Sequence, residues 1–445
     1  MQKHYRIIFQ SFDPDNQSEV TQITLNTGEI KIPVDLFDIG FSHAEQIALI
    51  QKTQDTLLKE QFTTRNDTIK YCPHCDNVKL VREGQNKSNY YDIFTDHKIT
   101  LTRKHCPTCN YEAEATMKTI FGSELSAQLA KVQSELGSNY SYRDSEQLFE
   151  LFSQNKREIN NHDRIKQTSE IIGAEIKKLH KNENEMIAIM PAKELIINVD
   201  GGHINTTEVG KRSFEAMAAV IYKPESLHPN KSGTRNILTN KHCAASTFND
   251  NQYEMIANTI VAALKEGLTP NTHITALCDG AKNCWQIIDA IKPLAATTTC
   301  ILDWFHLSMK IHNIALPDDL KNQLESVKWH LWHGQVDNSL AKLKTLIWDA
   351  PDKHQLLLKK LQTYIANNTD KIVNYDERHH QGLVYTSNLA EGTVESLINQ
   401  RCKGQQHMRW SRGGLDPILQ LRAAINSNEW HNNWKTLVTN AISIH

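Results

Sequence analysis

Residues 195–203 of this chain read LIINVDGGH, and this stretch decides the fold. Its first five positions hold four apolar residues, which predicts a buried strand. The apolar run stops at Asp200. Gly201 and Gly202 follow, and glycines allow a sharp turn or the close approach of another backbone. A buried strand that ends on a carboxylate indicates either a metal ligand or catalytic acid, or a plain cap or turn residue.

The same design recurs further along the chain. Residues 273–281 read HITALCDGA, a predicted strand that ends on Asp279. Residues 298–306 read TTCILDWFH, a strand that ends on Asp303 and leads to His306. The other predicted elements here are strands at 214–222 and 241–246 and helices at 252–266 and 285–291. The predicted order is that of an RNase H-like α/β fold: three strands, a helix, a strand, a helix and a strand.

A third carboxylate follows a long interruption. Residues 307–385 are predicted to be helical, which indicates an all-helical insertion into the core. Glu395 then lies on a predicted helix. In an RNase H-like sheet the strands of Asp200 and Asp279 would be parallel neighbours, and this helix would bring Glu395 to their ends. Converging carboxylates repel one another unless cations neutralise them. The sequence therefore predicts two Mg²⁺ (or Mn²⁺) ions, suited to in-line phosphodiester displacement.

Taken in order, these motifs resemble those of bacterial insertion-sequence transposases of the DDE type, including Mutator-like relatives with a Cys/Asp-x-x-His signature. The matching pieces are VDGG at 199–202, CDGA at 278–281, LDWFH at 302–306, GTVES at 392–396 and MRWS at 408–411. The resemblance implies that Asp200, Asp279 and Glu395 are the catalytic and metal-binding residues, with Asp303 and His306 supporting them. It also implies binding of the terminal inverted repeats of a mobile element, followed by DNA strand cleavage and strand transfer.

Several alternatives stay open. Asp303 also ends a strand and could replace Asp279 as the second ligand. Glu391 lies one turn before Glu395 on the same helical face. An RNase H-like nuclease that cuts without joining would share these carboxylates. A domesticated, non-catalytic DNA-binding protein would use only the N-terminal regions.

Two CxxC motifs precede the core. Each can chelate a metal from a tight turn, and together they predict one structural Zn²⁺. The four predicted ligands are Cys72, Cys75, Cys106 and Cys109. Strand-like runs at 90–94 and 99–101 between the motifs predict a zinc ribbon. Arg103 and Lys104, beside the second motif, suit DNA phosphate or a solvated edge equally.

The region after the zinc ribbon is predicted to be helical. Helices are predicted from apolar periodicity at residues 125–136, 144–152 and 159–179. Asp144 or Ser145 would be the N-cap of the second. Three short helices indicate a helix-turn-helix DNA-binding domain, with a recognition helix within 160–168 that exposes Arg164 and Lys166. A helical linker or bundle is the alternative.

A basic and aromatic stretch lies near the C-terminus. Its members are Arg401, Lys403, His407, Arg409, Trp410 and Arg412. Such a stretch suits a DNA backbone, with Trp410 able to stack on an unpaired base. The alternative is a solvated helix face with Trp410 in the core. A helix is predicted after it, at residues 417–425.

The first 65 residues have no legible chemistry. Strands are predicted at 5–9, 20–25 and 29–32, with a turn at residues 26–28. A helix at 42–61 would be capped by Ser42. The pattern predicts a small accessory or dimerising subdomain.

The 445-residue length predicts two to four domains. The predicted segments are an accessory subdomain (1–65), a zinc ribbon (66–118), a helical DNA-binding domain (119–190), the first part of the core (191–306), the insertion (307–385) and the second part of the core with the catalytic Glu (386–445).

Composition narrows the class of protein. The chain is 39% hydrophobic and 22% charged, as expected of a globular protein. Its net charge of −2 neither marks nor excludes a nucleic-acid binder, because charge can segregate by domain. No apolar run approaches the roughly 18 residues of a membrane span, and the N-terminus lacks an apolar signal core. We therefore expect a cytoplasmic protein away from membranes. The resemblance to DDE transposases implies a nucleoid-associated protein that binds double-stranded DNA as a homodimer or higher oligomer, since two element ends must be brought together.

Overall fold

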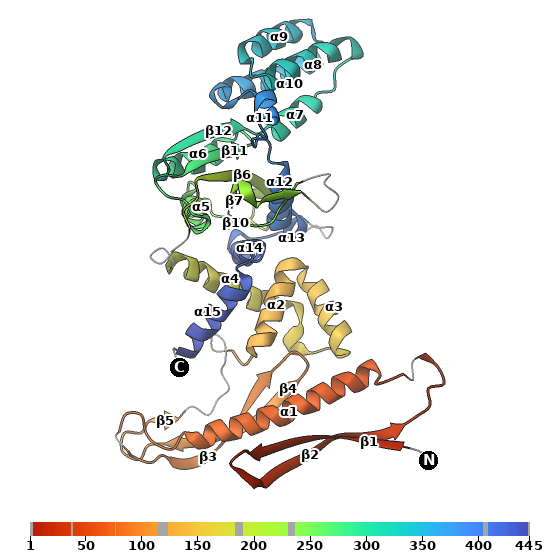
Figure 1. The fold of residues 1–445 in the computed structure, drawn as a ribbon, viewed down its shortest axis with the longest axis vertical. Coiled ribbons are helices and arrows are strands. Elements are labelled where there is room, and N and C mark those ends of the chain that lie inside the picture. The colour runs from red at the N-terminus through yellow and green to blue at the C-terminus, as the bar shows by residue number, and fades with distance from the viewer. Residues whose placement is uncertain are drawn as a thin grey trace. The chain divides into compact units, whose positions relative to one another are not determined.

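The computed structural model describes residues 3–36, 39–75, 77–113, 123–182, 190–229, 236–403 and 408–443 (Figure 1). The chain divides into two compact units. The first comprises Met1–Thr168 and Val438–His445, and the second comprises Ser169–Leu437. Each unit is described separately below.

The first unit begins with a two-stranded hairpin of β1 (Lys3–Asp13) and β2 (Asn16–Ile30). The predicted turn at residues 26–28 is wrong, because these residues pair with Tyr5, Arg6 and Ile7 inside the hairpin. Strand pairing thus overrides a local turn signal, and two predicted strands are one.

A long helix, α1 (His43–Thr68), follows the hairpin. As predicted, Ser42 is its N-cap. The Ser42 side chain accepts from the Glu45 backbone N–H, and the Glu45 side chain accepts from that of Ser42. This reciprocal pair is a capping box, which fixes the start of the helix.

The zinc-ribbon region forms a three-stranded antiparallel sheet of β3 (Val81–Tyr91), β4 (Asp96–His105) and β5 (Glu112–Ala113). The predicted strand at 99–101 lies within β4. The one predicted at 90–94 is mostly a turn, because Asp92 accepts hydrogen bonds from the backbone N–H groups of Phe94 and Thr95.

Three helices follow, as predicted: α2 (Ala127–Asn139), α3 (Tyr142–Ser153) and α4 (His162–Asn182). The expected cap of the second helix at Asp144 or Ser145 is wrong. Ser141 is the N-cap, and its hydroxyl accepts from the Asp144 N–H at 3.0 Å. The helix therefore starts earlier than its apolar pattern suggests.

The second unit is built on a mixed five-stranded sheet with the order β10-β7-β6-β11-β12. Its strands are β6 (Glu194–Asn205), β7 (Ser213–Tyr222), β10 (His242–Ser246), β11 (His273–Cys278) and β12 (Thr297–Leu302). β7 runs antiparallel to both β6 and β10, whereas β6, β11 and β12 are parallel. A short hairpin of β8 (Leu227–Pro229) and β9 (Asn236–Leu238) lies between β7 and β10 in the chain.

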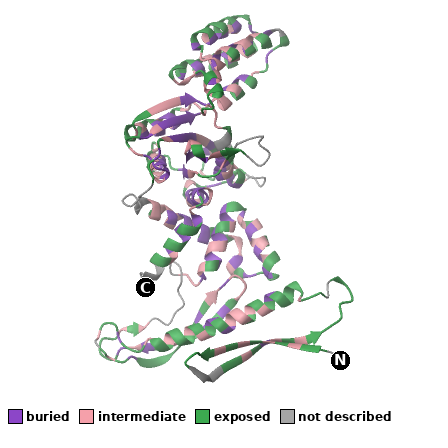
Figure 2. Cartoon of the chain, in the orientation of Figure 1, coloured by how far each residue is buried: buried purple, intermediate pink, exposed green. Residues whose placement is uncertain are grey.

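The central strand is buried on both faces, as strands in the middle of such sheets are. Leu195, Ile197 and Val199 point into an apolar core with α5 (Tyr253–Glu266) and α6 (Lys282–Ile291). The alternate residues, which include Asp200, lie on the opposite face. Figure 2 shows the sheet as the buried centre of its unit, in contrast to the largely exposed hairpin β1–β2.

The expectation that the central strand stops at Asp200 is wrong. β6 continues through both glycines, with Gly201 opposite Met217 and Gly202 opposite Ala216 on β7. The neighbour on the other side does stop here, since the last residue of β11, Cys278, pairs with Val199. Asp200 therefore lies where β6 loses one neighbour and keeps the other.

Helices fill the rest of the second unit. Those predicted as the insertion are α7 (Trp304–His312), α8 (Asp318–Trp332), α9 (Val336–Asp349), α10 (Asp352–Asn367) and α11 (Tyr375–His380). Those after it are α12 (Asn388–Val394), the π-helical turn η8 (Glu395–Asn399), α13 (Gln400–Cys402), α14 (Arg412–Asn426) and α15 (Trp430–Ser443). The boundary between the two units falls inside α15, after Leu437. At the start of α7, just before the predicted insertion (307–385), the Trp304 ring packs 4.9 Å from that of Trp332 and 4.8 Å from that of Tyr375 within it.

Candidate functional site

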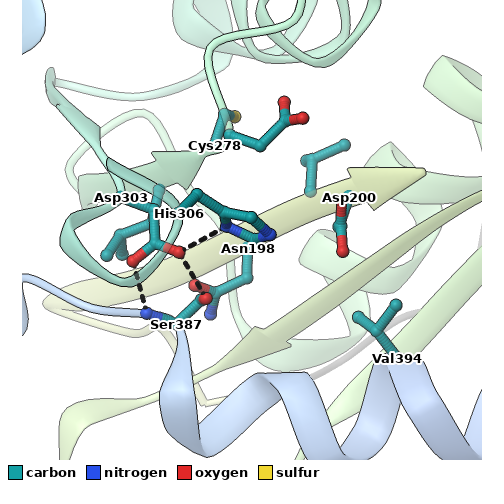
Figure 3. Close-up of a pocket in the computed structure, with 10 residues that line it drawn as sticks. Asn198, Asp200, Cys278, Asp303, His306, Ser387 and Val394 are labelled. Atoms are coloured by element: carbon teal, nitrogen blue, oxygen red, sulfur yellow. Dashed lines mark hydrogen bonds and ion pairs between the residues drawn. The ribbon is translucent and has the colours of Figure 1, made fainter. Parts of the chain in front are cut away.

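Two predicted ligands, Asp200 and Asp279, lie where the pairing between the parallel strands β6 and β11 ends. Because Val199 is paired with Cys278, the next residues, Asp200 and Asp279, leave the paired segment side by side. Both line one pocket, shown in Figure 3. The other polar residues of this pocket are Asn198, Asp303, His306 and Ser387. We call this group the carboxylate pocket.

The charge balance of the pocket favours a cation. Burial raises the pKa of Asp200 above its ordinary value, and the negative charges of Asp279 and Asp303 raise it further. His306 and a hydrogen bond from the Gly201 N–H act in the opposite direction but do not cancel these effects. A divalent cation would offset the repulsion that disfavours the charged form, and carboxylate oxygens are the donors that Mg²⁺ prefers.

The turn that carries Asp279 is fixed by its own backbone and by the insertion. Asp279 accepts from the Ala281 N–H at 2.9 Å, and Gly280 has a φ of +89°. The Tyr364 hydroxyl, from α10, donates to the backbone carbonyl of Asp279 at 2.6 Å. A Cβ on Gly280 would lie 2.8 Å from the Tyr364 ring. Tyr364 was not predicted, because no local sequence motif marks it.

Asp303 has a different environment from Asp279. It is the N-cap of α7 and is only 1% exposed. Its two oxygens accept hydrogen bonds from the Phe305 N–H, from His306 Nδ1, and from both the N–H and hydroxyl of Ser387, at 2.6–3.2 Å. These bonds outweigh the opposing effect of burial and lower the pKa of Asp303. The predicted strand over 298–306 accordingly ends at Leu302, and Asp303 begins a helix.

His306 is oriented by Asp303 toward the other carboxylates. Its Nδ1 lies 2.7 Å from Asp303 Oδ2, and Figure 3 shows the ring directed toward Asp200. Burial acts to lower the pKa of His306. The bond to Asp303 and the charges of Asp200 and Asp279 outweigh burial and raise it. Ser387, whose backbone N–H and hydroxyl donate to the two carboxylate oxygens of Asp303, was not predicted.

Glu395 lies beside the pocket but not in it. Its helix meets β6 at Gly202, where a Cβ would lie 3.2 Å from Ile398 and 3.7 Å from Asn399 Oδ1. Val394 lines the pocket (Figure 3). The Glu395 side chain is exposed and accepts a hydrogen bond from Asn399. The side chain of Glu391 is outside the described part of the structure.

The four predicted zinc ligands come together in the first unit. Across the described ranges, Cys72, Cys75, Cys106 and Cys109 form the only group of three or more Cys, His, Asp or Glu residues whose ligand atoms lie within 4.8 Å of one another. Four thiolates at this spacing could hold one structural Zn²⁺ ion.

Backbone N–H groups point at the sulfurs of Cys72 and Cys106. The His74 N–H points at Cys72 Sγ, with 3.4 Å between nitrogen and sulfur. Burial disfavours ionisation of Cys106. Hydrogen bonds from the Cys109 and Thr108 backbones, together with the neighbouring thiols, outweigh burial and lower its pKa to about 6. The pKa of Cys72 is raised, chiefly by burial, and that of Cys75 is raised to about 12, chiefly by its hydrogen bond with Cys109. Metal ligation requires deprotonated thiols, so without metal the site favours the thiolate at Cys106, and Cys72 and Cys75 would lose their protons on binding zinc.

The predicted phosphate contacts beside the zinc ligands have protein partners. Lys104 is buried, and its ammonium donates to the carbonyl oxygens of Asn66 and Ile69 at the end of α1. It is therefore not available to a DNA phosphate. Arg103 is half-exposed and lies 3.8 Å from Glu83 and 3.9 Å from Glu112.

The C-terminal basic stretch divides into buried and exposed members. The Arg401 guanidinium is buried and stacks 4.8 Å from the centre of the Trp410 ring. Trp410 is buried too, and its backbone N–H donates to Asn205 at the end of β6. Base stacking by Trp410 is therefore excluded in this conformation, and the core placement is correct. Arg412 pairs with Glu208 at 3.2 Å.

The remaining predicted DNA contacts are exposed. They are Lys403 and Arg409 in the second unit and Arg164 and Lys166 on α4. Arg164 and Lys166 flank the fully buried Ile165, so α4 has the amphipathic character expected of a helix with one solvent-facing side.

Comparison with known proteins gives no relative, since no protein-family model and no characterised protein matches the chain. None of the described helices is long and apolar enough to cross a membrane.

Proposed function

We propose that this chain is a DDE transposase with an RNase H-like core, which cuts DNA at the ends of a mobile element and joins them to a target. The observation that carries the proposal is that Asp200 and Asp279 directly follow the last paired residues of two parallel strands and line one pocket. The sheet order supports it. Numbered in chain order, the strands lie in the order third, second, first, fourth and fifth, and the fourth and fifth (β11 and β12) each follow a helix.

In this proposal Asp200, Asp279 and Glu395 hold two Mg²⁺ or Mn²⁺ ions. When bound, such ions activate a water or a 3′-hydroxyl and stabilise the leaving oxygen. To reach the pocket, the Glu395 carboxylate gives up the hydrogen bond that it accepts from the Asn399 side chain and changes its rotamer. Glu395 lies on an exposed helix face, which leaves room for this change. Asp303 is not a ligand here, because four donors occupy its oxygens. Its role is to orient His306.

DNA is held by exposed basic residues on both units. Lys403 lies near β6, since its Nζ is 3.6 Å from a Cβ built on Gly202, and Gly202 is two residues from Asp200. Arg409 extends this surface. Arg164 and Lys166 on α4 supply the helix-turn-helix contacts. A nucleoid-associated location follows from DNA binding.

The test is a strand-transfer assay with Mg²⁺ and DNA that flanks the coding sequence on both sides. Cleavage and joining are expected. Replacing one ligand should remove about 4 kcal/mol of transition-state stabilisation, or about a thousandfold in rate. Asp200→Asn and Asp279→Asn should show this loss, whereas Asp318→Asn, an exposed carboxylate on α8, should not.

The rival functions give other results. Cleavage without joining indicates a nuclease. DNA binding without cleavage, together with no Mn²⁺ binding by electron paramagnetic resonance, indicates a regulator and contradicts the proposal. Loss of activity in Asp303→Ala but not in Asp279→Ala would transfer the ligand role to Asp303.

A further inference from the structure

The N-terminal hairpin leaves one long strand edge open. β1 is hydrogen-bonded only to β2 among the described residues, so its other edge presents unpaired backbone groups over eleven residues. Two-stranded hairpins are marginally stable in water, and a flat open edge is a template for pairing with another strand.

The two edges of the hairpin are not equivalent. Both irregularities of register place the extra residues in β2. The first leaves Leu25 unpaired between Asn26 and Thr24. The second separates Val20 from Asn16. Bulges disfavour the pairing of another strand along the edge that carries them. β1 has no bulge, and its side chains alternate between half-buried and exposed along its length.

The charges at the two ends of β1 are self-complementary. Lys3 lies at its start and Asp13 at its end, and the segment between Ile7 and Ser11 has no charge. In an antiparallel pair of two β1 strands, one register pairs all eleven residues, and its two-fold axis passes through Ile8. That register sets Lys3 opposite Asp13 twice and brings no like charges together, since Arg6 faces the neutral Gln10.

The same register matches the apolar side chains. Ile8, which is 38% exposed, would face its own copy, and Ile7 would face Phe9. We propose that β1 is a dimerisation edge, and that a second copy of this chain pairs with it to form a four-stranded sheet of order β2-β1-β1-β2. Cross-strand pairs of this kind stabilise antiparallel sheets. The interface is independent of the carboxylate pocket.

Sedimentation equilibrium on the full-length protein tests the proposal. A dimer is expected. Asp13→Lys replaces two attractive pairs with two repulsive ones and should weaken the dimer about 10- to 100-fold. Adding Lys3→Asp to that variant should restore the dimer. Glu29→Lys makes the same charge change on β2, one strand from the edge, and should leave the dimer unchanged.

A second measurement fixes the register. Under oxidation, Ile8→Cys should give a peptide disulfide-linked to itself at position 8, identified by mass spectrometry, whereas Gln10→Cys should not. An unchanged zinc content in each variant shows that the first unit is folded. A monomer at about 100 µM, or a dimer insensitive to Asp13→Lys, overturns the proposal.

Discussion

At the residue scale, Gly280 and Lys104 show how single residues stabilise the structure around them. Gly280 combines a positive φ with contact to Tyr364, and so it fixes the turn of Asp279. Lys104 binds the last carbonyl groups of α1 and so ties β4 to that helix. Each role predicts a distinct mutational effect.

Gly280→Ala should destabilise the second unit by about 2–4 kcal/mol, because it adds overpacking against Tyr364 to the strain of a left-handed residue. Gly382→Ala is the matched control. Its φ is +69° but nothing lies within 4 Å of its Cβ position, so about 1 kcal/mol is expected. Urea unfolding measures both. Equal losses would mean that the Tyr364 contact is unimportant.

Lys104→Ala should lower the free energy of unfolding of the first unit by about 1.5–3 kcal/mol, since two carbonyl groups lose a charged donor. Arg103→Ala, one residue away and half-exposed, should change it by less than about 0.5 kcal/mol. A fall in DNA affinity without a loss of stability in Lys104→Ala would restore the phosphate-binding role expected from sequence.

At the scale of elements, the first unit is joined by a buried histidine. His97 on β4 lies 3.0 Å from Asp55 on α1 and 2.9 Å from Asp92 in the β3–β4 turn. Burial acts to lower the pKa of His97, but the two carboxylates outweigh it and raise the pKa above 6.5. Lys59 shares Asp55.

This arrangement predicts a pH-dependent stability. The contribution of His97 is fully present below pH 6.5, its unfolded pKa, and is lost as pH rises through the higher folded pKa. Asp55 and Asp92 have lowered pKa values, so their contribution is lost only in acid. Thermal unfolding between pH 6 and 9 should show the decline, and His97→Gln should flatten it. His4→Gln, in the exposed hairpin, should leave the profile unchanged.

The elements also show what the sequence could predict. The zinc ligands were predictable because CxxC chelation is local. Asp200 and Asp279 were recognisable from apolar runs that end on a carboxylate. Tyr364 and Ser387 were not, because each meets its partner only after the insertion folds back. The burial of Trp410 likewise depends on its pairing with the end of β6.

At the scale of the whole molecule, the two compact units predict two unfolding transitions. Zinc binding contributes to folding only where the ligands lie, which is the first unit. Chelation of zinc should therefore lower one transition temperature in calorimetry and leave the other within about 1 °C. Cys106→Ser should do the same. A shift of both transitions would mean that the units fold as one.

The Asp303–Ser387 contact has a further consequence for this molecule. These residues stand at the entrance and exit of the helical insertion, and a second bond joins the Trp304 N–H to the Tyr385 carbonyl. The insertion is thus a loop closed at its base, and chain ends held this close tolerate exchange of what lies between them. An engineer could replace residues between Asp303 and Ser387 with a foreign domain of matching termini and keep the sheet, but the new protein would lack His306 of the carboxylate pocket and the Tyr364 hydroxyl that donates to the Asp279 carbonyl.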